Sequence, residues 1–419
     1  MNALYFWAAA ALLTLQAPAQ PPQPDRRPTF RSATALVEVD IIARDGGGRF
    51  VSNLTAADFE VFEDGQRQTI DHFYLVTRQR AVGHEPVSAD ASRGPDRSER
   101  RVFIFFFDSE HLSTASLLKL KNAAMDFVNT DLRPDDFAGV YVNGALVNGH
   151  LTNQKQELLD AIRGAEPATE NVDTRMRALL DFPRIDSYLE AARIEGGDRG
   201  ALTDAGQRAC GGGDTAKLCE NEGGREYVED KLQRKARLFV DQTRHAAGDS
   251  VRSMTYVVRN LAGLEGRKTL LLLSEGFTLD DARANLPLLA GQASRAGVTI
   301  YSIDARGAGA RSGSSPATDP TVRGPGLSGV GDVSDEALDV LASQTGGLTL
   351  RWRDDFRTAF ADVGSDTSTY YVLAYTPQNA VLDGKYRKIA LTLKTPGVTI
   401  RARRGYVASP LPPPKAIRR

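Results

Sequence analysis

An apolar stretch in this chain ends directly on an acid, and several kinds of polar residue follow it. Residues 102–113 read VFIFFFDSEHLS, so that Asp108, Glu110 and Ser113 lie close together in sequence. Carboxylate and hydroxyl oxygens are the ligands that hard cations such as Mg²⁺ and Ca²⁺ take. Two carboxylates in different environments can instead serve as an acid and a base. This segment is therefore the strongest candidate for chemistry.

Three later segments repeat the pattern of an apolar run that ends in an oxygen-bearing side chain. Asn143 follows GVYV, Ser274 and Glu275 follow TLLLL, and Asp304 follows VTIYSI. The carboxyl ends of parallel strands share one edge, where open α/β sheets bind their ligands. We therefore expect these side chains to lie near Asp108. The alternative is that they only cap the helices that follow, as Asp and Ser commonly do.

The elements that hold these residues alternate between strands and helices. A continuous β-branched and aromatic run is typical of a strand buried on both faces. Such strands are expected at 102–107, 137–142, 268–274 and 298–303, with helices at 113–130, 154–163, 226–262, 282–296 and 334–344. This alternation predicts an α/β domain over residues 101–365 with a doubly wound, mostly parallel sheet.

The helix expected at 226–262 is the most regular element, because its apolar residues step by three and four. At 1.5 Å per residue it would extend about 50 Å, so we expect it to project from the domain or to break near Gly248. A charged, glycine-rich insertion at residues 165–225 precedes it, and we expect this insertion to be helical. The insertion contains the two cysteines of the chain, Cys210 and Cys219, which we expect to form a disulfide in an exported protein.

Both ends of the chain carry short strand patterns separated by turn signals. Residues 30–77 and 366–408 alternate apolar and polar side chains, which is typical of strands. The first of these segments is too short for an independent core. We therefore predict that the two segments pair into one β-sandwich-like module. Residues 78–100 are polar and contain proline and glycine, which predicts a linker.

The first 19 residues have the pattern of a secretory signal peptide. An apolar stretch ends at Leu15, and the small residues Ala17 and Ala19 follow it. The stretch is shorter than the roughly 20 residues that cross a bilayer. The alternative is an uncleaved anchor, and only then is contact with a membrane expected. In both cases the body of the protein is exported, to the periplasm, the outer envelope or the medium.

Composition and motifs argue against two functional classes. The formal net charge is −1 with acids and bases interspersed, so nucleic acid is not an expected partner. The sequence contains neither Gly-x-Ser-x-Gly nor His-Glu-x-x-His, and its histidines show no ligand spacing. We therefore assign no catalytic residue and do not expect an enzyme.

Taken in order, these segments resemble the von Willebrand factor A domain. The segments VFIFFFDSEHLS, LTNQKQELLDAI, KTLLLLSEGF and VTIYSIDARG follow the order of that domain over residues 101–365. More closely, the chain resembles the exported bacterial group described as acidobacterial VWFA-related proteins. That resemblance rests on LVEVDIIARDGGGRFVSNLTAADFEVFEDG near the amino end, and on YYVLAYTP and DGKYRKIALTLKTPGVTIRARRGY near the carboxyl end.

The resemblance implies a metal-ion-dependent adhesion site, from which this chain departs. That site uses Asp-x-Ser-x-Ser after the first strand, a Thr from a second loop and an Asp after the fourth strand. Here Glu110 and Leu112 occupy the two serine positions, and Glu275 stands where the last acid is expected. The threonine has only loose candidates, Thr169 and Thr174.

The candidate metal ligands are therefore Asp108, Glu110, Ser113 and Glu275, with Ser109 as a further substitute for a missing serine. We expect an exported, non-enzymatic protein that binds a protein or glycan ligand at this edge, with Mg²⁺ or Ca²⁺ in a degenerate adhesion site. Two alternatives stay open. One is an envelope hydrolase that uses the edge carboxylates as an acid and base pair, and the other is a structural scaffold without metal.

Overall fold

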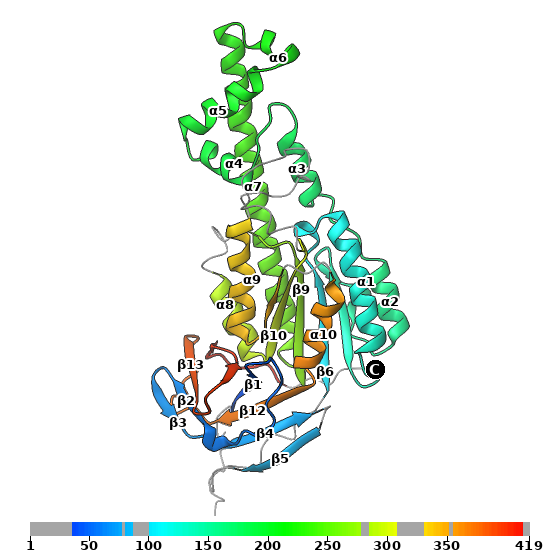
Figure 1. Ribbon diagram of the computed structural model, residues 1–419, viewed down its shortest axis with the longest axis vertical. Helices are drawn as coiled ribbons and strands as arrows, with labels where there is room; N and C mark the ends of the chain where they lie inside the picture. The colour runs from blue at the N-terminus through cyan, green and yellow to red at the C-terminus, as the bar shows by residue number, and fades with distance from the viewer. Residues whose placement is uncertain are drawn as a thin grey trace, which may run out of the picture.

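The computed structural model describes residues 36–77, 80–86, 100–277, 285–307, 331–351 and 355–413. Three parts lie along one long axis: a terminal β-module, a central α/β domain and a helical arm (Figure 1). The signal peptide predicted at residues 1–19 lies outside the described residues. None of the helices in these ranges has a stretch long and apolar enough to span a bilayer.

The central domain contains a mixed sheet, which in the described residues has six strands in the order β11-β10-β9-β6-β7-β8. Neighbouring strands from β11 to β7 run parallel, and β8 pairs antiparallel with β7. The strands are β6 (Arg101–Phe107), β7 (Phe137–Val142), β8 (Ala145–Leu146), β9 (Arg267–Ser274), β10 (Val298–Asp304) and β11 (Thr349–Leu350). The prediction of an α/β fold with a mostly parallel sheet is confirmed at this level.

Helices cover both faces of this sheet (Figure 1). One face packs against α1, α2 and α10, and the other against α8, α9 and the last part of α7. The helices are α1 (Thr114–Thr130), α2 (Lys155–Arg163), α7 (Glu222–Leu261), α8 (Leu286–Arg295), α9 (Gly331–Thr345) and α10 (Phe356–Asp366). Short 3-10 turns η2 (Ser109–His111) and η3 (Val147–Gly149) follow β6 and β8.

Burial on both faces explains the unbroken apolar run of β6. Its side chains alternate between the two cores, because successive residues of a strand point to opposite faces. Phe105 packs its ring 6.0 Å from that of Phe127 in α1 and 6.3 Å from that of Phe360 in α10. Its neighbour Ile104 lies in the opposite core with Met254 of α7.

The terminal β-module joins strands from the two ends of the chain. One antiparallel sheet has the order β14-β1-β12-β4-β5, and a second has the order β15-β13-β2-β3. The strands are β1 (Val37–Asp45), β2 (Phe59–Glu63), β3 (Gln66–Gln68), β4 (His72–Thr77), β5 (Arg80–Pro86), β12 (Thr369–Tyr375), β13 (Tyr386–Leu393), β14 (Val398–Arg401) and β15 (Gly405–Val407), with the 3-10 turn η1 (Ala56–Asp58) before β2. Both sheets contribute to one core, in which Phe73 stacks 5.2 Å from Tyr371.

Two details of this module differ from the sequence prediction. The linker expected at 78–100 begins later, because residues 80–86 form β5 and pair with β4. This strand forms because its backbone pairs with the edge of β4. Its residues do not alternate between apolar and polar, so the sequence pattern does not predict it. The sequence also predicts a strand at residues 398–403, but β14 ends at Arg401 and the chain then crosses to the second sheet as β15.

The helical arm, residues 172–240, is built on the first half of α7. It comprises α3 (Val172–Leu180), α4 (Tyr188–Glu195), α5 (Arg199–Cys210) and α6 (Gly213–Leu218). The helices α3, α4 and α5 pack on α7 around their own apolar core, and α6 packs against α5. α7 is a continuous helix of 40 residues, about 60 Å long, so it projects and does not break at Gly248. Cys210, the last residue of α5, and Cys219, which follows α6, form a disulfide. The helix α6 lies at the outer end of the arm (Figure 1).

A buried carboxylate joins the terminal module to the central domain. Asp366, at the end of α10, is 3% exposed, and its Oδ1 lies 2.7 Å from the guanidinium of Arg44 in β1. Arg401 of β14 pairs with the other oxygen, and the Tyr301 hydroxyl of β10 donates to it at 3.4 Å. β12 begins three residues after α10. Strands from both chain ends therefore meet at this one side chain.

We expect Asp366→Asn to lower the free energy of unfolding by about 3–5 kcal/mol, because two arginines would lose their counter-charge in a largely buried site. Urea unfolding of the full chain measures the change. Asp204→Asn is the matched control, since Asp204 is exposed on α5 and has no ion pair among the described residues. A change below about 1 kcal/mol for Asp366→Asn, in the range of exposed ion pairs, would contradict this role.

Candidate ligand site at the carboxyl edge of the central sheet

The direction in which the chain builds the sheet reverses between β6 and β9. From β6 the chain adds β7 on one side, and it later adds β9, β10 and β11 in turn on the other side. Open α/β sheets bind ligands at the carboxyl ends of the strands beside such a reversal. Phe107 pairs in register with Leu273, so Asp108 and Glu275 follow neighbouring strand ends. The predicted acids therefore lie on one edge, beside the reversal.

Asp108 is the most thoroughly hydrogen-bonded of the predicted ligands. Its carboxylate is 3% exposed and accepts hydrogen bonds from the Ser250 hydroxyl at 2.5 Å and the Ser274 hydroxyl at 2.8 Å. His111 Nδ1 lies 3.1 Å from Oδ1. The backbone N–H of Asp108 donates to the Leu273 carbonyl at 3.0 Å. Side chains from α7, β9 and η2 thus converge on one carboxylate.

These contacts favour the ionised form of Asp108. Burial by itself raises its pKa, but the neighbouring His111 and the hydrogen bonds from that ring and the two serines outweigh this, and the pKa lies below its ordinary value. Because the carboxylate faces Nδ1, the Nδ1 proton belongs in this bond. Nε2 of His111 is buried and has no hydrogen-bond partner among the described residues. The Phe277 ring lies 5.5 Å from the imidazole.

Glu275 and Ser113 lie together, and both form hydrogen bonds with the start of α1. The Glu275 carboxylate accepts a hydrogen bond from the Ser113 backbone N–H at 3.0 Å, and its own N–H donates to the His111 carbonyl at 2.9 Å. The Ser113 hydroxyl caps α1 by accepting from the Ser116 N–H at 3.2 Å. Negative charge is favourable at a helix N-terminus. For these two residues the capping alternative describes the contacts.

Glu110 lies near Asp108 and next to the base of the arm. Burial raises the pKa of its carboxyl, with Asp249 of α7 among the charges nearby. The Glu110 carbonyl accepts a hydrogen bond from Arg175 of α3 at 2.7 Å. The Asp173 carboxylate of α3 accepts another from the Thr114 N–H at the start of α1, at 2.8 Å. The arm is therefore attached to the loop that carries the candidate ligands.

The remaining candidates are already paired within the protein. Asp304 binds the Arg306 guanidinium through both oxygens, at 2.9 and 2.6 Å. The Ser109 hydroxyl accepts from the Asn143 N–H at 3.3 Å. Thr174 lies in α3, where its hydroxyl donates to the Thr169 carbonyl at 3.2 Å. All of these residues lie at the carboxyl edge or the arm base, but they do not point to a common centre.

Ser250 is the residue of this network that sequence reasoning missed. It lies on α7, 142 positions from Asp108, and is 5% exposed. Its place between Ala247 and Met254 puts it on the apolar face of the helix, where a hydroxyl needs a partner. A single polar residue on the buried, apolar face of a helix indicates a hydrogen-bond partner in the core, and this was the sequence signal that could have pointed to Ser250. The partner's identity depended on how α7 crosses the sheet.

The donor set does not fit a cation held directly by Asp108. Both oxygens of that carboxylate already accept hydrogen bonds from protein donors, and displacing them would leave buried groups unpaired. The Glu275 carboxylate is bound to the start of α1. In the part of the chain that the structure describes, no three His, Cys, Asp or Glu side chains converge as metal ligands. A cation at this edge would have to be held largely by hydroxyl, carbonyl or water oxygens.

The comparisons with known proteins leave the family unassigned, because no protein-family model and no curated protein matches the chain. The resemblance to von Willebrand factor A domains therefore stays a prediction based on the sequence segments.

We expect Ser250→Ala to lower the free energy of unfolding at neutral pH by about 1.5–3 kcal/mol, the contribution of a hydrogen bond to a buried charge. The pKa of Asp108 is lowered in the folded state, so the ionised carboxylate contributes its full stabilisation of the fold above the ordinary pKa of 3.8. This stabilisation is lost as the pH falls through the pKa that Asp108 has in the folded state. The difference from wild type should therefore shrink below that pH. Urea unfolding at several pH values measures it, with Ser253→Ala as the control on a partly exposed site of the same helix. Equal stability of both variants at neutral pH would remove Ser250 from the network.

Calorimetric titration with Mg²⁺, Ca²⁺ and Mn²⁺ tests the fit of the metal site. Because both oxygens of Asp108 already accept hydrogen bonds from protein donors, we expect wild type and Asp108→Asn to give the same heats, with no saturable step that depends on this residue. Glu110→Gln is a second variant, since that carboxylate accepts no hydrogen bond from the described residues. A saturable step that disappears in Asp108→Asn would show that the network opens to accept a cation.

Proposed function

We propose that this chain is an exported binding protein in which a von Willebrand A-like, doubly wound domain presents the helical arm to a protein or glycan ligand. The proposal differs from a conventional adhesion site in one respect. The ligand contacts the arm that covers the strand ends, and the Asp108 network holds that arm in place.

The observation that carries the proposal is the attachment of the arm at the sheet reversal. Ser250 of α7 donates to Asp108, Arg175 of α3 donates to the Glu110 carbonyl, and Asp173 of α3 accepts from the start of α1. These contacts come from both helices that enter the arm. A ligand that approaches this edge therefore meets the arm before it meets Asp108, which is 3% exposed.

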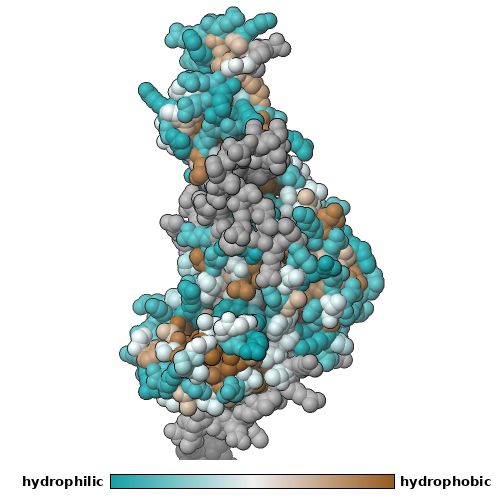
Figure 2. All heavy atoms as spheres, in the orientation of Figure 1, coloured by the Kyte–Doolittle hydropathy of each residue, from teal (hydrophilic) through white to brown (hydrophobic). Residues whose placement is uncertain are grey.

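The arm carries a row of exposed side chains suited to binding. Tyr227, Lys231 and Leu238 follow one another at helical spacing on α7, with Tyr227 49% and Leu238 60% exposed. The Lys231 ammonium lies 5.6 Å from the ring of Phe182 and 6.0 Å from that of Tyr227. Aromatic residues are enriched at the centres of protein interfaces. The arm is otherwise mainly hydrophilic on the face shown in Figure 2.

The hydrolase alternative has less support from the same contacts. Asp108 and Glu275 both accept hydrogen bonds from protein groups, and the pKa of Asp108 is lowered, which makes it a weak base. A general base works best when its pKa lies near the operating pH. The contacts of Asp108 move its pKa away from that range.

Retention of a partner from an envelope extract of the native cells tests the proposal. We expect the double variant Tyr227→Ser, Leu238→Ser to bind the retained partner at least about tenfold more weakly than wild type, because buried interface anchors contribute about 1–4 kcal/mol each. Tyr256→Ser is the matched control, since Tyr256 is 62% exposed on the same helix below the arm. Equal binding by all three proteins, or no partner that distinguishes them, would exclude the arm as the contact surface and favour the scaffold alternative.

A further inference from the structure

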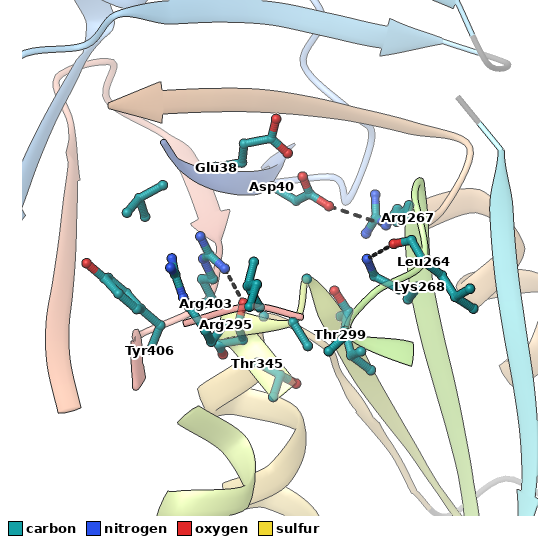
Figure 3. Close-up of a pocket in the computed structure, with 18 of the residues that line it drawn as sticks. Glu38, Asp40, Leu264, Arg267, Lys268, Arg295, Thr299, Thr345, Arg403 and Tyr406 are labelled. Atoms are coloured by element: carbon teal, nitrogen blue, oxygen red, sulfur yellow. Dashed lines mark hydrogen bonds and ion pairs between the residues drawn. The ribbon is translucent and has the colours of Figure 1, made fainter. Parts of the chain in front are cut away.

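A cavity lies at the opposite end of the central sheet from Asp108, between that sheet and the terminal β-module (Figure 3). Its volume is about 590 Å³, and residues of β1, β9, α8 and the segment that enters β15 line it. Ligand pockets for small molecules typically measure about 300–1,000 Å³. The cavity is therefore of the size for a small molecule.

Charged side chains line this cavity unevenly. The cations are Arg267, Lys268, Arg295 and Arg403, and the acids are Glu38, Asp40 and the exposed Glu265. In Figure 3 the two acids of β1 lie above the cavity, and Asp40 is 3.5 Å from the Arg267 guanidinium. The other end holds Arg295 and Arg403 beside Tyr406. Cations therefore lie at both ends of the cavity, and at the Tyr406 end Glu38 and Asp40 act on Arg403 without forming an ion pair with it.

Neither guanidinium at that end is paired with a carboxylate of the described residues. Arg295 donates through Nε to the Ser409 carbonyl at 2.8 Å, and Arg403 donates to the Ser294 carbonyl. Nε of Arg403 is buried without a hydrogen-bond partner in the described parts of the chain. Burial lowers the pKa of both groups. Two incompletely solvated cations therefore face the same space.

The backbone around Arg403 holds this arrangement in place. Gly346 has a φ of +81°, and a Cβ there would lie 2.7 Å from the Arg403 nitrogen. Only glycine allows the end of α9 to approach so closely in this conformation. The next N–H, that of Arg404, donates to the Gln344 carbonyl at 3.0 Å. The Tyr406 ring centroid lies 5.6 Å from the Arg295 guanidinium and 6.0 Å from that of Arg403, which orients both.

We propose that this cavity binds a small molecule carrying an oxyanion, a phosphate or a carboxylate, whose oxygens accept hydrogen bonds from Arg295 and Arg403. Guanidinium groups match planar or tetrahedral oxyanions through paired N–H donors, and such charge-assisted bonds are strong. The anion would give these two arginines a counter-charge within hydrogen-bond distance. The site is separate from the arm surface, so the proposal does not depend on the function proposed above.

Calorimetric titration of the full chain with inorganic phosphate and with citrate, at constant ionic strength in chloride, tests this site. We expect saturable binding to wild type of at least one of them, weakened about ten- to a hundredfold in Arg403→Gln and in Arg295→Gln. Arg404→Gln is the matched control, because it removes the same charge from the adjacent, exposed position. Its binding should equal that of wild type.

The two probes separate the two kinds of ligand. Tighter binding of phosphate assigns a phosphate-bearing ligand, and tighter binding of citrate a carboxylate-bearing one. Circular dichroism confirms the fold of each variant, and if Arg403→Gln does not fold then Arg295→Gln decides. Absence of saturable binding by wild type, or equal weakening in Arg404→Gln, would overturn the proposal.

Discussion

The buried carboxylate of Asp108 is the interaction on which the arrangement of this molecule depends. An ionised side chain that is 3% exposed is stable only when hydrogen bonds replace its water. Here these come from Ser274 of the neighbouring strand, His111 of the following turn and Ser250 of α7. The same α7 continues outward as the core of the helical arm. The requirement to satisfy one charge therefore connects the sheet edge to the orientation of the arm.

The two ends of the central sheet differ in how their charges are satisfied. At the carboxyl edge Asp108, Glu275 and Asp304 accept hydrogen bonds from serines, the N-terminus of α1 and an arginine, whereas the Glu110 carboxylate accepts none from the described residues. At the amino edge, beside the terminal β-module, Arg295 and Arg403 have carbonyl partners and no carboxylate among the described residues. Incompletely compensated charge is thus found at the junction of the two modules, away from the edge where sheets of this class usually bind ligands.

Much of the central domain could be predicted, because its signals are local. The runs 102–107 and 268–274 are apolar without alternation, and each forms a strand buried on both faces. The register that brings Asp108 and Glu275 to one edge follows from parallel pairing. The direction of each carboxylate could not be predicted, because it depends on a helix more than a hundred residues away, as the contact of Ser250 with Asp108 shows. The strand at residues 80–86 was missed for a similar reason, since its pairing with β4 comes from backbone groups.

By itself the sequence determined the main strands and helices of the central domain, which residues are apolar enough to form its cores, and which acids follow the strand ends. These properties depend on neighbours a few positions away along the chain. Only the tertiary structure showed that both oxygens of Asp108 accept hydrogen bonds from protein donors, and that Glu275 accepts one from the start of α1. It also showed that Arg295 and Arg403 share a cavity with Tyr406. Whether a side chain can still bind a ligand depends on the donors and acceptors that packing brings within hydrogen-bond distance of it. These groups come from distant parts of the chain, so a local sequence pattern cannot predict them.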